Sequence, residues 1–294
     1  MLDLKKAPSN LTKAYAAVFL LGKGRLDYLL YKASPRFFLK ALAMLGYAAD
    51  ERYSRMQKTF YEGLATLSPE SVVGFFDAHE EFPYEDFLLR NAPRDGITTK
   101  LALDFGCGMG RMIKRMSPYF QRVDGVDIAK PNIEAAKKYT DSLPRRPLFY
   151  VNNGRDLSDI PSAAYQFVYS TIAMQHIPVH SIRMNLFREF HRILGEGQIA
   201  IQMVYSASSE RARIRQKDFG DRFRNITFSE WEDDFYEAKS TNGANDVIIT
   251  DRTVPKAISD IARLGFRDVE VAFSEPPHET IYDKWIYIYG RKRS

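Results

Sequence analysis

The chain has 294 residues, of which 45% are hydrophobic and 27% charged, proportions that exclude disordered, collagen-like and low-complexity proteins. The formal net charge of +5 mildly favours an anionic partner or surface but is too small to indicate nucleic-acid binding. A single cysteine, Cys107, fits a reduced, cytoplasmic setting, and the longest apolar run, residues 14–21, is far shorter than the roughly 20 residues of a membrane span.

The first region of the chain, residues 1–95, is predicted to form a helical N-terminal cap. Residues 1–58 contain eleven basic and four acidic residues, whereas residues 59–95 contain two basic and eight acidic ones. Apolar residues at three- and four-residue intervals over 53–67 predict a helix with one apolar face. Serine, proline and glutamate at 68–70 predict that another helix begins there. A cluster of helix-breaking residues at 91–96 marks the boundary of the main domain.

From residue 98 onwards, short apolar runs alternate with helical segments. Strands are predicted at residues 101–105, 122–127, 148–151, 166–170, 198–205, 269–273 and 285–289. Helices are predicted at about residues 111–116, 131–139, 181–194 and 254–264. This alternation predicts an α/β domain over 96–294, with a doubly wound, mostly parallel seven-stranded sheet. Because no helix separates the last two strands, one of them is expected to insert antiparallel.

Residues 206–247 interrupt this alternation. They are charged and aromatic, with Trp231, Phe235 and Tyr236 among acidic and basic residues. A segment of this length without a regular pattern is usually functional, which favours an inserted lid or a substrate-binding flap. A solvated helical elaboration is the alternative.

The most informative segment is Asp104-Phe105-Gly106-Cys107-Gly108-Met109-Gly110-Arg111, between the first predicted strand and its helix. Glycines allow the backbone to turn tightly and to approach a ligand closely. A dinucleotide-binding fingerprint would space its glycines as G-x-G-x-x-G. Here the third glycine comes one residue early, Arg111 stands in its place, and Asp104 is not part of that pattern. The motif therefore disfavours NAD.

This segment resembles motif I, D/E-x-G-x-G-x-G, of class I S-adenosylmethionine-dependent methyltransferases, and the resemblance continues in order over residues 98–292. It implies a Rossmann-like methyltransferase fold and S-adenosylmethionine as the cofactor. Residues 165–170 and 191–198 are similar to the family's fourth strand and its turn into the fifth, although Gln166 and Gln198 replace a common aspartate and glycine. The cofactor-binding residues that the resemblance implies are Asp104, Gly106, Cys107, Gly108, Gly110, Arg111, Asp127, Ile128, Asn153, Gly154, Arg155 and Thr171.

The resemblance also implies individual roles within this set. Asp127 ends the second strand, where the family's acid accepts hydrogen bonds from both ribose hydroxyls, a role that suits an acceptor-only carboxylate. Ile128 would pack on the adenine face. Asn153 would accept a hydrogen bond from the adenine amine through its amide oxygen. Cys107 is small and is expected to pack against the cofactor instead of acting as a nucleophile.

The acceptor site is expected where residues 170–178 leave the fourth strand. The N/D-P-P-Y/F sequence of enzymes that methylate base or glutamine amines is absent, and residues 175–178, Gln-His-Ile-Pro, instead resemble small-molecule methyltransferases. O-methylation needs a base, and His176 is the candidate because histidine titrates near neutrality. A helix-capping or packing role for His176 is the alternative. His180 and His191 are expected to be structural or exposed, and no metal-ligand spacing is present.

The sequence also allows alternative hypotheses for the partners and for the activity of the protein. The basic, aromatic segment 1–45 could lie on an anionic membrane surface, which would suit a lipid- or polymer-linked substrate, or it could pack on the catalytic domain or on a second copy of the chain in a homodimer. A non-catalytic S-adenosylmethionine-binding protein would not need the cap and the insertion. Aminopropyl transfer would need an acid directly after the fourth strand, where Ser170 and Thr171 supply none.

Overall fold

The computed structural model describes residues 49–65, 76–92, 99–220, 223, 226–233 and 245–293. The helices are α4 (Ala49–Leu64), α6 (Phe76–Glu81), α7 (Tyr84–Leu88), α8 (Arg111–Met116), α9 (Lys130–Tyr139), the short 3₁₀ helix η3 (Met174–His176), α10 (His180–Ile193), α11 (Ser209–Asp218) and α12 (Val254–Arg263). The strands are β1 (Leu101–Phe105), β2 (Arg122–Asp127), β3 (Phe149–Val151), β4 (Tyr165–Ser170), β5 (Leu194–Tyr205), β6 (Thr227–Glu230), β7 (Asn245–Ile249), β8 (Arg267–Ser274) and β9 (Lys284–Lys292). The basic segment 1–45 and the helix expected from Ser68 lie outside the described residues. Within those residues, no helix combines the length and the apolar character that a membrane span requires.

All the strands belong to one mostly parallel sheet. β3, β2, β1, β4 and β5 are parallel neighbours in that order. β9 lies antiparallel to β5 on its other side, from Gly197 opposite Lys292 to Tyr205 opposite Lys284, and β8 pairs antiparallel with β9. The doubly wound α/β fold and the antiparallel insertion of the final strand are thereby confirmed.

The number of strands was underestimated, because two of them come from the segment predicted to be a lid. β7 pairs with β5 at Val204 and Tyr205, beyond the last residue that β5 pairs with β4, and β6 pairs with β7. Among the described residues, the sheet therefore has nine strands, where the sequence predicts seven. β6 (Thr-Phe-Ser-Glu) has a single apolar residue and β7 (Asn-Asp-Val-Ile-Ile) begins with two polar ones, so neither shows a clear apolar pattern in the sequence.

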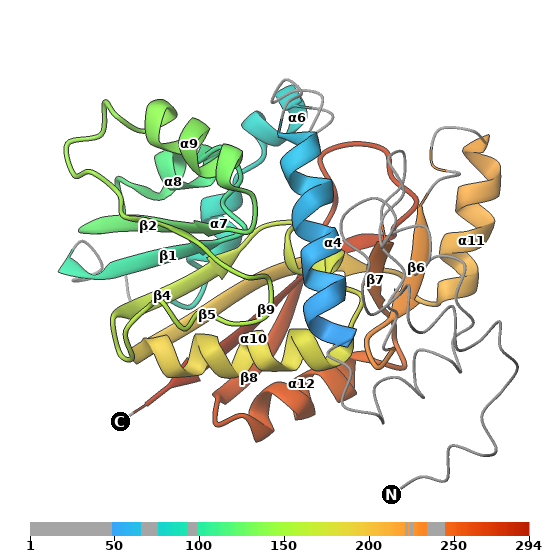
Figure 1. Cartoon of the computed structure of the whole chain (residues 1–294). Coiled ribbons are helices and arrows are strands. Elements are labelled where there is room, and N and C mark those ends of the chain that lie inside the picture. The colour runs from blue at the N-terminus through green and yellow to red at the C-terminus, as the bar shows by residue number, and fades with distance from the viewer. Residues whose placement is uncertain are drawn as a thin grey trace, which may run out of the picture.

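Helices cover both faces of the sheet, with α8 and α9 on one face and α10 and α12 on the other (Figure 1). Each face has its own buried apolar cluster: Met112, Ile113 and Ile133 belong to one, and Phe187 and Ile261 to the other. Parallel strands covered on both faces are almost completely buried, as β1 and β4 show. The ends of the strands are therefore the places where polar chemistry can be presented.

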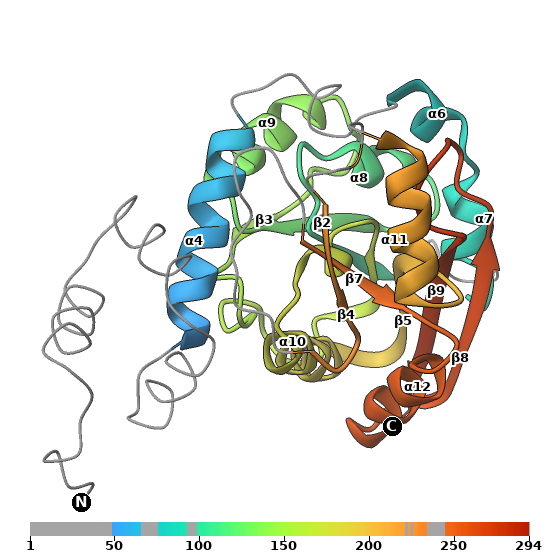
Figure 2. The ribbon, with the colours of Figure 1, turned by 90° about the vertical axis from the view of Figure 1, so that its right-hand side faces the viewer.

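Helix α4 lies beside β3, at one edge of the sheet (Figures 1 and 2). Tyr53 is buried in the same cluster as Phe105, the last residue of β1. A Cβ atom placed on Gly154, just after β3, would lie 3.4 Å from the Cβ of Ser54. At the start of the helix, the Ser181 hydroxyl donates a hydrogen bond of 3.4 Å to Asp50. The described part of the predicted cap thus lies against the edge of the sheet where ligands bind in this class of fold.

Helices α6 and α7 are fixed to α8, next to the glycine motif. Arg115 donates to both carboxylate oxygens of Glu85, at 2.8 and 2.7 Å. Arg111 and Arg115 both donate to the carbonyl oxygen of His79. The His79 imidazole makes a 2.7 Å hydrogen bond with the Tyr84 hydroxyl, and burial lowers the pKa of His79 to about 3. A neutral, buried His79 therefore acts as a structural anchor.

Candidate active site

The glycine motif forms a tight turn that touches the segment following β4. The amides of Gly106 and Cys107 both donate to the Val126 carbonyl, at 2.8 and 3.1 Å, which ties the turn to β2. Gly106 has a φ of +73°, and a Cβ atom there would lie 2.2 Å from the Cβ of Ala173. Only glycine fits both this conformation and this contact. The first glycine of the motif therefore brings the cofactor side of the site against the acceptor side.

Asp127 holds the motif from the end of β2. One of its carboxylate oxygens accepts from the Gly108 amide at 2.9 Å, and the other accepts from the Ala129 amide at 2.8 Å and the Asn132 side chain at 3.2 Å. Burial raises the pKa of Asp127, and these hydrogen bonds oppose the rise. A carboxylate has about four acceptor positions, so at most about one is left for a ligand.

Asp104 is a buried carboxylate at the end of β1, with 1% of its surface exposed. Its Oδ2 atom makes no hydrogen bond of ordinary geometry among the described residues, although the Tyr169 hydroxyl is close enough to lower its pKa. Burial raises the pKa of Asp104 to about 8, although the charge of Arg111 opposes the shift. A buried acceptor without a partner costs free energy, so this atom suits a cationic or donor group of a bound ligand.

The thiol of Cys107 packs beneath the turn. A Cβ atom placed on Gly125 of β2 would lie 2.8 Å from the Cys107 sulfur. Burial and the neighbouring charge of Asp127 raise the pKa of this thiol well above its ordinary value. A neutral thiol packed on β2 is a poor nucleophile, and contact with a cofactor would fall to the backbone of Cys107.

The arrangement after β3 differs from the expectation for Asn153. Its amide oxygen accepts from the amides of Arg155 and Asp156, at 2.8 and 3.0 Å, and its nitrogen donates to the Asp156 carboxylate at 2.8 Å. Both lone pairs of the oxygen are used by this local turn, so Asn153 does not offer the adenine acceptor that we expected. The sequence could not distinguish a ligand-binding asparagine from one that closes a turn.

The remaining predicted cofactor residues lie around the same edge. Ile128 packs against Gly154, where a Cβ atom would lie 2.6 Å from the Ile128 Cδ1 atom. Gly110 has a φ of +88° and precedes the first residue of α8, Arg111. Thr171 is half-buried at the exit of β4. The Nε atom of Arg155 is buried and has no hydrogen-bond partner among the described residues.

On the acceptor side, His176 is paired with a carboxylate that the sequence analysis did not identify. Its Nδ1 atom lies 2.6 Å from Oδ1 of Asp246, although the two residues are 70 positions apart. The Tyr282 hydroxyl donates to the other oxygen of Asp246. The Asp246 side chain is 4% exposed and that of His176 is 20% exposed, so the imidazole can meet a ligand while its partner stays buried. No motif marks Asp246, because it reaches His176 only through the pairing of β7 with β5.

The backbone before His176 is held in an unusual conformation. Ile172 has a φ of +66°, which is rare for a β-branched residue and costs conformational energy. Its amide donates at 2.7 Å to the side chain of Gln202, a fully buried residue of β5. Gln202 therefore fixes the path of residues 171–176 and is a second site residue missed in the sequence analysis. The available signal was a single amide side chain within the apolar run 199–205 of β5.

Tyr61 of α4 lies near both halves of the site. The pKa of its hydroxyl is raised by burial and by the negative charges of Asp246 and Asp127. The helix thus reaches from the predicted ribose position to the predicted base.

The insertion is attached to the main domain at several points. Arg183 of α10 is fully buried, donates to the carbonyl oxygens of Ile177 and Trp231, and lies 5.3 Å from the Trp231 ring. The Trp231 indole donates to Asp260 of α12 at 2.9 Å. His180 contacts the same carboxylate at 3.4 Å, in a structural role. The described residues of the insertion around Trp231 are thus attached to α10 and α12.

Two further observations concern other kinds of site. Among the described residues, no three or more histidine, cysteine or acidic side chains are grouped to hold a metal ion.

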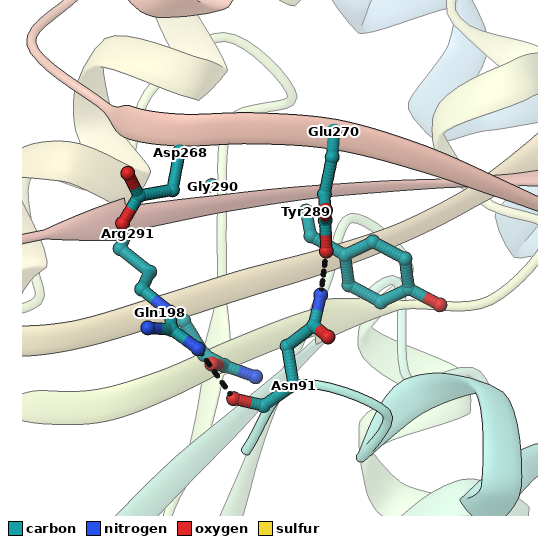
Figure 3. A pocket seen from close by; sticks show the side chains of 7 residues that line it. All are labelled: Asn91, Gln198, Asp268, Glu270, Tyr289, Gly290 and Arg291. Atoms are coloured by element: carbon teal, nitrogen blue, oxygen red, sulfur yellow. Dashed lines mark hydrogen bonds between the residues drawn. The ribbon is translucent and has the colours of Figure 1, made fainter. Parts of the chain in front are cut away.

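A hollow of about 300 Å³ lies near the amino end of β5, away from the carboxyl ends of the strands (Figure 3). Asn91 bridges this hollow by donating to Glu270 and accepting from Arg291. These bonds join the α7 region to β8 and β9, which is a structural role.

Comparisons with known proteins agree with this geometry. Residues 102–197 match the family model described as a methyltransferase domain. Comparison with curated proteins finds no match for the sequence.

Among solved structures, a methyltransferase from Leishmania major is 16% identical, with 82% of this chain and 83% of that one covered and a TM-score of 0.56. A Haloferax volcanii methyltransferase in complex with the Trm112 activator is 14% identical, with 80% and 96% covered and a TM-score of 0.54. DhpI, in a complex described as containing SAM and HEP, is 16% identical, with 81% and 96% covered and a TM-score of 0.52. At these identities the structures establish the fold.

Proposed function

Because the chain carries a class I S-adenosylmethionine-dependent methyltransferase domain, we propose that it methylates a hydroxyl group of a small-molecule acceptor, with His176 as the general base. The observation that carries this proposal is the pairing of His176 with Asp246 beside the glycine motif. An alcohol is a poor nucleophile until its proton begins to leave, so a paired imidazole at the acceptor side suits this reaction.

The cofactor side of the site fits S-adenosylmethionine. When bound, this cofactor supplies a methyl group on a sulfonium, which is a good leaving group. The buried Oδ2 of Asp104 suits the ammonium of its amino-acid end, and the remaining acceptor position of Asp127 suits a ribose hydroxyl. The glycine turn leaves room for the backbone to contact the cofactor closely.

The acceptor side would orient and deprotonate the hydroxyl. Since a carboxylate only accepts hydrogen bonds, Asp246 selects the His176 tautomer that is protonated on Nδ1 and carries its lone pair on Nε2. Nε2 then takes the proton of the acceptor hydroxyl, and the charge of Asp246 stabilises the imidazolium. Helix α4 and strand β7 help to exclude water from the site, which strengthens these interactions.

The test is the His176→Ala variant. Its turnover should fall by about 10²–10⁴-fold, because the acceptor proton loses its base, while its affinity for S-adenosylhomocysteine stays nearly unchanged. The native rate should also fall as the pH is lowered and the imidazole takes up a proton. His191→Ala is the matched control, because that histidine packs on Phe266 at the far end of α10.

To identify the acceptor, a panel of alcohols, phenols and amines would be assayed for release of S-adenosylhomocysteine. An active but less stable His176→Ala enzyme would remove the base and favour an acceptor that needs none, such as an amine.

A further inference from the structure

We infer that Gln57, on the N-terminal helix α4, binds the ribose of the cofactor and accepts the hydroxyl that Asp127 cannot take. This inference rests on the proposed use of S-adenosylmethionine and names a cofactor-binding residue outside the matched methyltransferase domain, residues 102–197.

Gln57 is a buried amide that lacks hydrogen bonds. Only 5% of its surface is exposed, and neither its Oε1 nor its Nε2 atom has a partner among the described residues. Buried polar groups in folded proteins almost always have partners, because an unpaired amide loses its hydration without compensation. Both functional atoms of Gln57 are therefore available to a ligand that enters the site.

The neighbours of Gln57 on α4 show where this amide lies. Tyr53 and Tyr61 are four residues before and after it, so all three share one face of the helix. Ser54, three residues before it, lies against Gly154, which in turn contacts Ile128. The hydroxyl of Tyr61 is close enough to Asp127 and Asp246 for both charges to raise its pKa. Gln57 thus lies between the predicted adenine position and the region flanked by Asp127 and Asp246.

The hydrogen bonds of Asp127 supply the reason for a second acceptor. Three donors of the chain, the Gly108 and Ala129 amides and the Asn132 side chain, already occupy its carboxylate. The ribose carries two hydroxyl donors, and about one acceptor position remains on Asp127. The Oε1 atom of Gln57 can accept a hydrogen bond from the second hydroxyl.

Another buried amide makes a useful contrast. The Oε1 atom of Gln175 also has no partner among the described residues, but Gln175 adjoins His176 in η3. Its position assigns it to the acceptor side, so it does not compete with Gln57 for the ribose.

The experiment measures S-adenosylhomocysteine binding by calorimetry in native protein and in Gln57→Leu. Leucine keeps a similar volume and removes both polar atoms. Affinity should fall about 5–30-fold, because hydrogen bonds to the ribose are lost, while the melting temperature of the ligand-free variant stays equal or rises as an unpaired buried amide is removed. Thr59→Ala, at an exposed position of the same helix, is the control and should bind like the native protein.

The 2′-deoxy and 3′-deoxy analogues of S-adenosylhomocysteine identify the contact. With the analogue that lacks the hydroxyl bound by Gln57, native protein and Gln57→Leu should bind equally well. The inference would be overturned if Gln57→Leu bound S-adenosylhomocysteine as tightly as the native protein. It would also be overturned if the substitution lowered the affinity for both analogues by the same factor as for the parent ligand. Should Gln57→Leu fold poorly, Gln57→Met provides the same comparison. Failure of the native protein to bind S-adenosylhomocysteine would instead contradict the proposed function.

Discussion

The two halves of the site are built in different ways. The cofactor half uses the ends of β1 and β2, where a glycine turn is held by the carboxylate of Asp127 through backbone amides. The acceptor half depends on side chains, His176 on η3 and Asp246 on β7, that are 70 residues apart. A turn is specified by neighbouring residues, whereas a pair of side chains from distant segments exists only when the sheet has formed. The two halves should therefore respond differently to substitution.

The largest effect is expected at Gly106, where the two halves touch. Gly106→Ala should lower the free energy of unfolding by about 3 kcal/mol, because its Cβ would meet Ala173 in a left-handed conformation. Gly108→Ala is the matched variant: its φ is +51°, but no atom lies within 4 Å of the added Cβ, so about 1 kcal/mol is expected. Urea denaturation measures both. Equal losses would show that the contact with Ala173 contributes nothing.

A somewhat smaller effect is expected from Asp246, and it should be confined to the acceptor half. Asp246→Asn should reduce turnover by about 10²-fold, since the imidazolium formed during proton transfer loses its counter-charge. Affinity for S-adenosylhomocysteine should not change. The control is Asp251→Asn, just beyond β7, where the carboxylate accepts from Tyr205 instead of a histidine. If Asp246→Asn kept native turnover and pH dependence, Asp246 would have only a structural role.

The smallest effect concerns Asp104 in the cofactor half, and it depends on pH. The pKa of this carboxyl is about 8 in the folded protein and 3.8 ordinarily, so the folded state binds more protons between these values. The free energy of unfolding should therefore fall as the pH rises from about 4 to about 8 and then level off.

Asp104→Asn removes this dependence, so its stability gain over the native protein should grow over that interval, by about 2–3 kcal/mol between pH 6 and pH 9. Urea denaturation of the ligand-free protein at pH 6 and pH 9 tests this, with the exposed Asp159→Asn as the control. A gain that is the same at both pH values would contradict the assigned burial effect.

The cofactor half and the central strands could be predicted because their signals are local. Residues 104–111 carry the turn chemistry within eight positions, and β1, β2, β4 and α12 begin and end within one residue of their predicted limits. The role of Asn153 could not be predicted, because a short polar side chain after a strand serves a turn and a ligand equally well in sequence. The strands of the insertion could not be predicted because β6 has one apolar residue and β7 begins with two polar ones, so neither shows a clear apolar pattern.

The sequence by itself determined the fold class, the glycine turn and the position of His176, because hydrophobic periodicity and glycine geometry act over a few residues. Only the tertiary structure decided what His176 and Gln57 can do. The pairing of β7 with β5 brings Asp246 to the imidazole, and the packing of α4 against the main domain buries Gln57 without a partner among the described residues. Contacts between segments this far apart depend on how the sheet and helices pack, which no local pattern encodes.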